Sequence, residues 1–302
     1  MDLIERNITK AEGARMSAGL DRHKIEHGDT TQPRQEFSFV AMDGEGWVGI
    51  ASGLVARTAT GYGDWIYLAE LFVEKEYRGR GLGAALLSRL EARAASAGIG
   101  NVFTWTAGYE APEFYRKQGY DVFLEKGDYY ASGHGRIGLR KALQVTTSAS
   151  CDRQIETGRV ALIGRRATDV ELNRMIDGFN EHTESHGNPS GPSERHSFVA
   201  MNGDEWVGTS TGLVPKKDVG YADWFGLGEL FVEQPHRGHG VGGDLLKRLE
   251  SKVASLGIGN AWTLAPSYEA GFYTRRGYEV FFEWRSSITE ATVRSASTRP
   301  FS

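Results

Sequence analysis

Cysteine, long apolar runs and an excess of positive charge are all scarce in this chain. The single cysteine of the 302 residues is Cys151, which excludes a disulfide within the chain and a cysteine-based zinc site. No apolar run reaches the roughly 18 residues that a membrane-spanning helix needs. The first residues are charged and no apolar segment follows them, so we expect no signal peptide, no membrane partner and a cytoplasmic location.

The charge balance gives no support to a nucleic-acid partner. The formal net charge is −4, and basic residues dominate neither half of the chain. What is present is ordinary for a globular protein, with 40% hydrophobic and 25% charged residues. A chain of this length predicts about two domains.

The chain contains a long internal repeat. Arg78 to Gly83 reads RGRGLG, and Arg237 to Gly242, starting 159 positions later, reads RGHGVG. The same offset aligns further segments, namely Phe39–Met42 with Phe198–Met201, Trp47–Gly49 with Trp206–Gly208, Asp64–Trp65 with Asp223–Trp224, and Glu70–Glu74 with Glu229–Glu233. A repeat of this size is far longer than a solenoid period, so each copy should have its own core.

We therefore predict two tandem domains, residues 1–145 and 159–302, joined by a polar linker at 146–158. Within one copy the pattern predicts a mixed α/β sheet. A strand at 4–9 and a helix at 12–27 come first, followed by a hairpin whose strands at 37–42 and 46–55 flank an Asp-Gly turn. A central strand at 65–73, a helix at 81–97, a strand at 102–106, a short helix at 112–118 and two final strands complete the copy. In the second copy we expect the last strand to be weak or missing.

The glycine-rich segment predicts an anion site. It follows a strand and opens a helix, where successive backbone N–H groups and the positive end of the helix dipole can hold a pyrophosphate. Glycine is needed where a side chain would block the ligand, and the arginines are expected to add charge only. A plain Gly-rich turn is the alternative, and the second copy argues against it.

Two pairs of repeated residues are candidates for acid–base chemistry. Glu70 shares the central strand with Ile66, Leu68 and Phe72, and Glu229 repeats it. An apolar setting would raise the pKa of such a carboxyl toward that of a useful general base, whereas the alternative is a structural salt bridge. Tyr115 and its repeat Tyr273 lie on the short helix, from which a phenol can protonate a leaving thiolate, or can simply pack in the core.

These residues together resemble the GNAT acetyltransferases. The resemblance rests on Leu71-Phe72-Val73, Arg78-x-x-Gly81-x-Gly83 and Phe114-Tyr115-x-x-x-Gly119-Tyr120, and on the same three motifs at 230–232, 237–242 and 272–278. It covers nearly the whole chain. One departure is the segment 106–110, which reads TAGYE where the family often has an asparagine.

The resemblance implies that each copy binds acetyl-CoA between a splayed strand and the glycine loop. The residues that it assigns to the cofactor are Phe72, Val73, Arg78, Gly79, Arg80, Gly81, Leu82, Gly83 and Ala84 in the first copy, and Phe231, Val232, Arg237, Gly238, His239, Gly240, Val241, Gly242 and Gly243 in the second. It also implies that Glu70 and Glu229 act as bases and Tyr115 and Tyr273 as acids. No metal is expected.

Two histidine pairs repeat as well, His23 with His27 and His182 with His186. Their spacing suits one helix face, so a metal site and a structural role are both open. The early helix of this family walls the acceptor pocket, which makes substrate binding our interpretation of the four.

The predicted protein is thus a tandem N-acetyltransferase that acts on a primary amine of a small molecule, such as an amino sugar or an amine-bearing antibiotic. A protein N-terminus or lysine is the rival acceptor, and an acyl-CoA sensor or scaffold without turnover is the alternative of another class. We expect a monomer that acts as a pseudo-dimer, or a homodimer.

Overall fold

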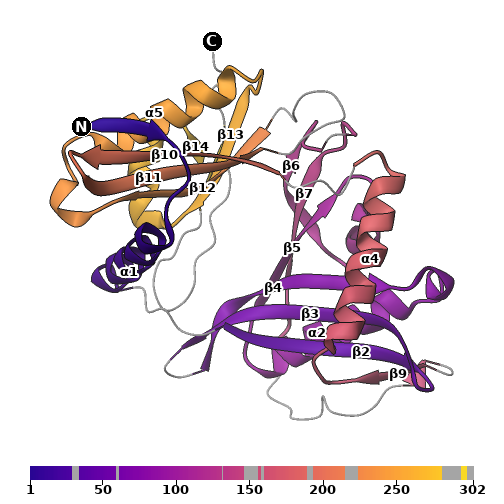
Figure 1. Cartoon of the computed structure of the whole chain (residues 1–302). Helices are drawn as coiled ribbons and strands as arrows, with labels where there is room; N and C mark the ends of the chain where they lie inside the picture. The colour runs from indigo at the N-terminus through magenta and orange to yellow at the C-terminus, as the bar shows by residue number, and fades with distance from the viewer. Residues whose placement is uncertain are drawn as a thin grey trace.

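The computed structural model describes residues 1–28, 34–58, 61–130, 132–145, 156–157, 160–188, 193–214, 224–280 and 294–297. Cys151 and most of the predicted linker lie outside these ranges. Two mixed sheets with helices on their faces make up the described part, which confirms the predicted α/β class (Figure 1).

The first sheet is built mainly from the first copy. Its strands are, in spatial order, β6 (Asp121–Lys126), β7 (Arg136–Ala142), β5 (Asn101–Ala107), β4 (Gly61–Val73), β3 (Gly46–Thr58), β2 (Arg34–Asp43), β9 (Val160–Ile163) and β8 (Glu156–Thr157). Its own copy supplies α2 (Leu82–Ser96), α3 (Pro112–Lys117) and the 3₁₀ turn η1 (Lys75–Tyr77).

The second sheet repeats this order with the second copy. It runs β1 (Asp2–Glu5), β10 (Glu194–Asn202), β11 (Glu205–Val214), β12 (Trp224–Val232), β13 (Asn260–Ala265), β15 (Arg294–Ser297) and β14 (Glu279–Val280). The second copy also contributes α5 (Val241–Ala254), α6 (Ala270–Thr274), η2 (Gln234–His236) and η3 (Ser267–Glu269). Strand β15 pairs with β13 and β14, so the last strand that the sequence suggested to be missing is present, as four residues.

The two copies exchange their first strands. β1 opens the chain but pairs with β10, with Ile4 opposite Val199, and β9 of the second copy pairs with β2, with Leu162 opposite Ala41. Because β2 and β10 are repeats of each other, either edge can accept a first strand from either copy. The packed halves therefore differ from the predicted units 1–145 and 159–302: the first half joins β2–β7 to β8 and β9, and the second joins β10–β15 to β1.

The helices that follow these strands are exchanged with them. Helix α4 (Asp169–Ser185) lies across β2, β3 and β4, on the face opposite α2 (Figure 1). Met175 packs with the buried residues Trp47 and Phe72, and the Cβ that an alanine would add at Gly178 would lie 2.5 Å from Cζ of Phe72. Arg174 is paired with Glu74 at the end of β4.

Helix α1 (Lys10–Glu26) makes the same contacts with the second half. Met16 packs with Trp206 and Phe231, and a Cβ at Gly19 would lie 2.3 Å from Cζ of Phe231. Arg15 donates to both oxygens of Glu233, at 3.0 and 2.7 Å. The matching contacts show that both exchanged helices are fitted to the sheet of the other copy.

Both exchanged helices begin with the same capping box. The Thr9 side chain accepts from the backbone N–H of Glu12, whose carboxylate accepts from the Thr9 N–H, and Thr168 and Glu171 repeat this arrangement. Arg6 holds Glu12 by two hydrogen bonds of 2.8 and 2.7 Å. These bonds and those of Thr9 lower the pKa of Glu12 to about 2, and the pKa of Glu171 is also about 2.

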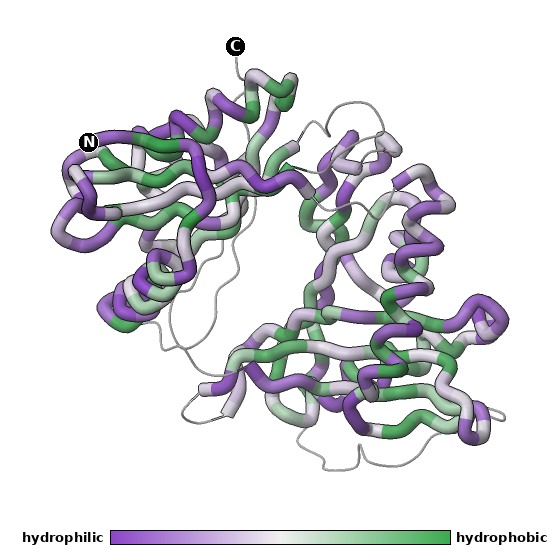
Figure 2. The backbone as a smooth tube through the Cα atoms, viewed as in Figure 1, coloured by the Kyte–Doolittle hydropathy of each residue, from purple (hydrophilic) through white to green (hydrophobic). Residues whose placement is uncertain are grey.

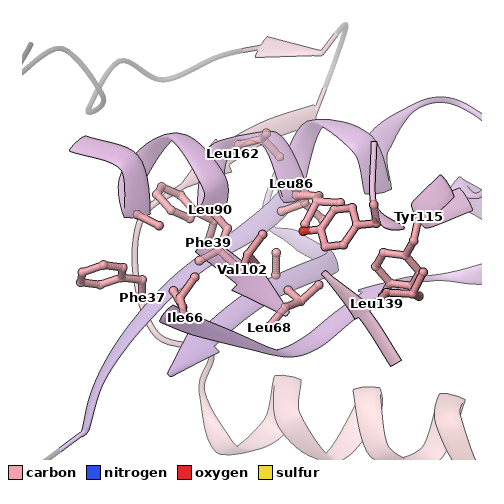
Figure 3. Packing of buried hydrophobic residues seen from close by; sticks show 14 of the residues in the cluster. Phe37, Phe39, Ile66, Leu68, Leu86, Leu90, Val102, Tyr115, Leu139 and Leu162 are labelled. Carbon is pink, nitrogen blue, oxygen red and sulfur yellow. The ribbon is translucent and has the colours of Figure 1, made fainter. Parts of the chain in front are cut away.

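Each half has its own core between the sheet and the helix of its own copy. In the first half, Leu86 and Leu90 of α2 pack on Ile66 and Leu68 (Figure 3). Leu162, from the exchanged strand β9, belongs to the same core. The sheet strands carry the longest apolar stretches of the tube, whereas α1 and α4 alternate between polar and apolar (Figure 2). Where the structure describes helices, none combines the length and apolarity of a membrane span.

Aromatic and cationic side chains join the two halves. The ammonium of Lys126 lies 3.7 Å from the ring centre of Trp224, and the guanidinium of Arg136 lies 5.1 Å from that of Trp262. Burial and the charge of Arg136 lower the pKa of Lys126 to about 7.

Candidate active site

A gap opens in each sheet where two parallel strands part. β4 pairs with β5 only from Trp65 to Tyr67, although both strands continue. β12 pairs with β13 over the corresponding residues 224–226. At the point of divergence Thr104 donates to the carbonyl of Leu68 at 3.0 Å, and in the second half Thr263 donates to Leu227. Beyond it, no strand in the described ranges covers this edge of β4, which leaves room for an extended ligand.

The glycine loop lies at the end of the parted strand. Gly79 and Gly81 have φ values of 75° and 81°, and Gly238 and Gly240 have 81° and 88°. A Cβ at any of them would meet no atom within 4 Å. Glycine is therefore needed here for its left-handed backbone and not for close packing, and the loop in front of α2 and α5 stays open to a ligand.

The first arginine of each loop does more than add charge, contrary to the expectation from the sequence. Arg78 Nε donates to the carbonyl of Val73 at 2.8 Å, and Arg237 Nε donates to Val232 at 2.9 Å. Each arginine thus ties the loop to the last residue of the parted strand. Its remaining guanidinium nitrogens stay available to an anion.

A β-bulge sets the direction of Glu70. Leu68 is opposite Gly53 and Glu70 is opposite Ser52, so Ala69 is an extra residue. Glu70 therefore leaves the face of Ile66 and Leu68, where the alternation of the sequence had placed it. It shares the face of Phe72 instead, beneath the exchanged helix α4. The second half has the same bulge, between Leu227 and Glu229.

The surroundings of the two glutamates differ. Burial and the neighbouring Glu36 raise the pKa of Glu70. Glu36 is in turn paired with the exposed Arg166 at 3.0 Å. At the position that repeats Glu36, the second half has Arg195, whose Nη1 lies 3.7 Å from Oε2 of Glu229. The carboxylate of Glu229 therefore faces a cation, the salt-bridge alternative that the sequence left open.

Tyr115 and Tyr273 lie at the start of α3 and α6, as predicted. Tyr115 is buried and packs edge-on against Tyr120, and burial raises its pKa, as it does for Tyr273. Side-chain hydrogen bonds with Thr104 and Thr263 act in the opposite direction. Both phenols stay protonated at neutral pH, which is the form that an acid needs.

The histidine pairs reach the site of the opposite half. His186 of α4 stacks on Tyr109 of the first half, with ring centres 5.2 Å apart. His27 of α1 stacks on Tyr268 of the second half at 4.2 Å. Within the described ranges no group of three or more His, Cys, Asp or Glu has metal-binding geometry. The exchange of helices brings each pair to the copy from which it is distant in sequence.

His23 makes the closest contacts of the four. Its Nδ1 lies 3.0 Å from Nη1 of Arg237, and its Nε2 lies 3.5 Å from Oε1 of Glu269. The guanidinium can only donate, so Nδ1 accepts and the proton is on Nε2, facing Glu269. Burial, Arg237 and His27 lower the pKa of His23, which keeps it neutral.

The sequence analysis gave no role to Glu110 and Glu269, which follow Tyr109 and Tyr268. Their recurrence at the repeat offset was the available signal. Glu110 Oε2 accepts from the hydroxyl of Thr106 at 2.6 Å and from the backbone N–H of Ala107 at 2.8 Å.

A cavity of about 540 Å³ joins these elements in the second half. Its lining residues come from the parted strand, the loop and helix α6, and include Val232, Gly240, Glu269, Phe272 and Tyr273. The cavity connects the anion loop with a phenol and a carboxylate, so that one ligand can reach all three.

Comparisons with known proteins agree with this geometry. A family model described as acetyltransferase (GNAT) domain matches residues 34–122 and 193–280, which omits both exchanged strands and helices. Blasticidin-S acetyltransferase of Streptomyces morookaense is 37% identical over 83 residues, 26% of this chain and 57% of that protein. The chain therefore aligns with little more than half the length of this curated relative.

Solved acetyltransferases match one half at a time. An acetyltransferase from Bacillus cereus is 25% identical, with a TM-score of 0.39 over 46% of this chain and 96% of its own. The ribosomal-protein-S18-alanine N-acetyltransferase from Escherichia coli is 14% identical, with a TM-score of 0.32 over 49% and 99%. The two segments that the family model matches make up more than half of the sequence. With two copies of its domain in one polypeptide, the chain belongs to the GNAT acetyltransferase family.

Proposed function

We propose that the protein transfers the acetyl group of acetyl-CoA to a primary amine of a small molecule. The observation that carries the proposal is the cavity of the second half, where the anion loop, the end of β12 and Tyr273 line one space of about 540 Å³. The first half has the same loop, the same parted strands and the same buried tyrosine. Membership of the GNAT family supports the reaction type.

The residues present fit acetyl-CoA. The N–H groups at the start of α2 and α5 and the free nitrogens of Arg78 and Arg237 would hold the pyrophosphate. The uncovered backbone of β4 and β12, up to Val73 and Val232, would bind the pantetheine arm. When bound, the thioester supplies an acyl carbon with a thiolate leaving group.

In the first half, Glu70 and Tyr115 are suited to the two proton transfers. Glu70 faces the acceptor side and its raised pKa lets it take a proton from an ammonium directly or through water. The amine then attacks the acyl carbon, and Tyr115 gives its proton to the thiolate. The phenol recovers a proton from the new amide nitrogen, and Glu70 releases the first one to solvent.

The acceptor would lie beneath the exchanged helices. His182, His186 and Tyr109 line this side in the first half, and His23, His27 and Tyr268 in the second. Aromatic walls of this kind suit a compact amine. The similarity to blasticidin-S acetyltransferase makes nucleoside-type and other amine antibiotics the first acceptors to test. We also propose a monomer, because the exchange already gives each half its partner helix.

The test is a panel of amines assayed for free CoA. The full chain is incubated with acetyl-CoA and, separately, blasticidin S, an aminoglycoside, a polyamine, a lysine peptide and a peptide with a free N-terminus. We expect rapid thiol release with at least one of the small amines. Release with the peptides alone would assign a protein acceptor, and binding of acetyl-CoA without release would assign a sensor. The Tyr115→Phe/Tyr273→Phe double variant is the control for enzyme-dependent release.

A further inference from the structure

The second half lacks the two groups that hold Glu110 in the first half. At the repeat offset, Thr106 is replaced by Ala265 and Ala107 by Pro266. Alanine has no hydroxyl, and proline has no N–H to donate. Glu269, the repeat of Glu110, is therefore free of both bonds.

Glu269 turns to the cavity and to the exchanged helix instead. It lines the cavity together with Tyr273, and His23 presents its Nε2 proton at 3.5 Å. Burial raises the pKa of Glu269, while the charges of Arg237, His27 and Lys24 lower it. The negative charge of Glu269 in turn raises the pKa of Tyr273, which places the two groups near each other.

Glu229 is in the opposite situation. In the first half the matching residue Glu70 has Glu36 as its neighbour, whereas Glu229 has the guanidinium of Arg195 at 3.7 Å. A carboxylate that faces a cation is a weaker base than one beside another carboxylate. The two halves thus hold and release opposite members of the same pair of glutamates.

We propose that Glu269, and not Glu229, is the general base of the second half, with His23 of α1 as its positioning residue. This inference rests on the acetyl transfer proposed above. Glu269 takes one proton from the acceptor ammonium and passes it to solvent. The nitrogen forms the bond to the acyl carbon, the carbon–sulfur bond breaks, and Tyr273 protonates the thiolate. The phenol is restored by the second nitrogen proton.

The experiment measures the second half alone, in the full chain. Gly83→Asp places a carboxylate in the first anion loop, and Tyr115→Phe is an independent way to silence that half; calorimetry with acetyl-CoA shows that the second loop still binds. In either background we expect Glu269→Gln to lower kcat by about 100-fold or more and Glu229→Gln to change it less than about threefold. With Gly242→Asp silencing the second half, Glu70→Gln should have the large effect and Glu110→Gln the small one.

A second variant tests the inference without altering Glu269. Ala265→Thr/Pro266→Ala restores the two donors of the first half, which stabilise the ionised carboxylate. We expect the acidic limb of the kcat/KM profile of the second half to move to lower pH and kcat to fall. The mirror variant Thr106→Ala/Ala107→Pro should leave the acidic limb of the first half unchanged.

The outcomes separate this inference from the proposed function. A large effect of Glu229→Gln together with a small effect of Glu269→Gln overturns the inference and leaves acetyl transfer standing. Turnover in the first half with none in the second also overturns it. Absence of thiol release from the wild-type chain with every amine overturns the proposed function itself.

Discussion

The two halves share one fold and differ in where they place charge. Each has a parted strand, an anion loop, a buried tyrosine and a helix taken from the other copy. Around the glutamate of the bulge, however, the first half has Glu36 and the second has Arg195. Around the glutamate after β5 or β13, the first half has Thr106 and the second has only Ala265. Equal backbones with exchanged electrostatics teach that a repeated active site can keep its geometry and change which residue titrates.

The largest effect should come from the loops, where the halves are alike. Gly81→Val or Gly240→Val forces a β-branched residue to a φ of 81° or 88°, a strain of about 3 kcal/mol that distorts the anion site. We expect acetyl-CoA binding at that half to weaken about 100-fold, so that calorimetry counts one tight site per chain in place of two. Gly44→Val carries a similar strain in a remote hairpin and should leave both sites intact. Loss of both sites from one substitution would contradict two independent loops.

The next effect tests the exchange of helices. Gly178→Ala places a methyl group 2.5 Å from the Phe72 ring and should destabilise the first half by about 2 kcal/mol, although residue 178 belongs to the second copy. Hydrogen exchange should show lost protection in β2–β4, with β10–β12 unchanged. Gly19→Ala should do the reverse. Gly13→Ala, on the same helix as Gly19 but with only Ile8 at 3.5 Å, is the control and should not destabilise. Loss of protection in the half of the same copy would refute the exchange.

Reversing the charge beside the bulge should shift pH profiles. Glu36→Arg replaces a neighbour that raises the pKa of Glu70 by one that lowers it. The base must be ionised to act, so the acidic limb of the first-half profile should move to lower pH by about one unit. Glu36→Gln should move it about half as far.

Arg195→Glu makes the same comparison in the second half. If Glu269 is the base there, the limb should stay in place, because the changed residue faces Glu229. A shift to higher pH would instead assign the base role to Glu229. Rate profiles of the two half-silenced chains supply the measurement.

The smallest effect concerns the capping boxes, where the halves agree again. Glu12 and Glu171 have a pKa of about 2 in the fold and an ordinary value near 4.5 when unfolded. Their contribution to stability is therefore complete above about pH 4.5 and is lost as the pH falls toward 2. Urea unfolding from pH 6 to pH 2.5 should show a flatter acid dependence for Glu171→Gln. Glu181→Gln, an exposed carboxylate of the same helix, should leave the slope unchanged; an identical slope for both variants would contradict the pairing with Arg165.

The repeat and the family motifs predicted the sheet order of each copy, the two loops and the two tyrosines. They did so because strand periodicity, left-handed glycines and a helix start are local properties. The face of Glu70 was predicted wrongly. Strict alternation assigns it to the side of Leu68, and the extra residue Ala69 is visible only in the pairing with β3. Glu269 was overlooked because its release depends on donors missing from Ala265 and Pro266, which matter only once their positions around it are known.

The sequence alone determined that this protein has two copies of one α/β acetyltransferase domain, each with an anion loop before a helix. Which copy completes which site was decided by the tertiary structure. β1 and β9 meet equivalent edges, β10 and β2, so local pattern cannot choose between pairing within a copy and pairing across copies. Only the packing of whole helices on the opposite sheets, with Phe72 against Gly178 and Phe231 against Gly19, makes the exchanged arrangement visible.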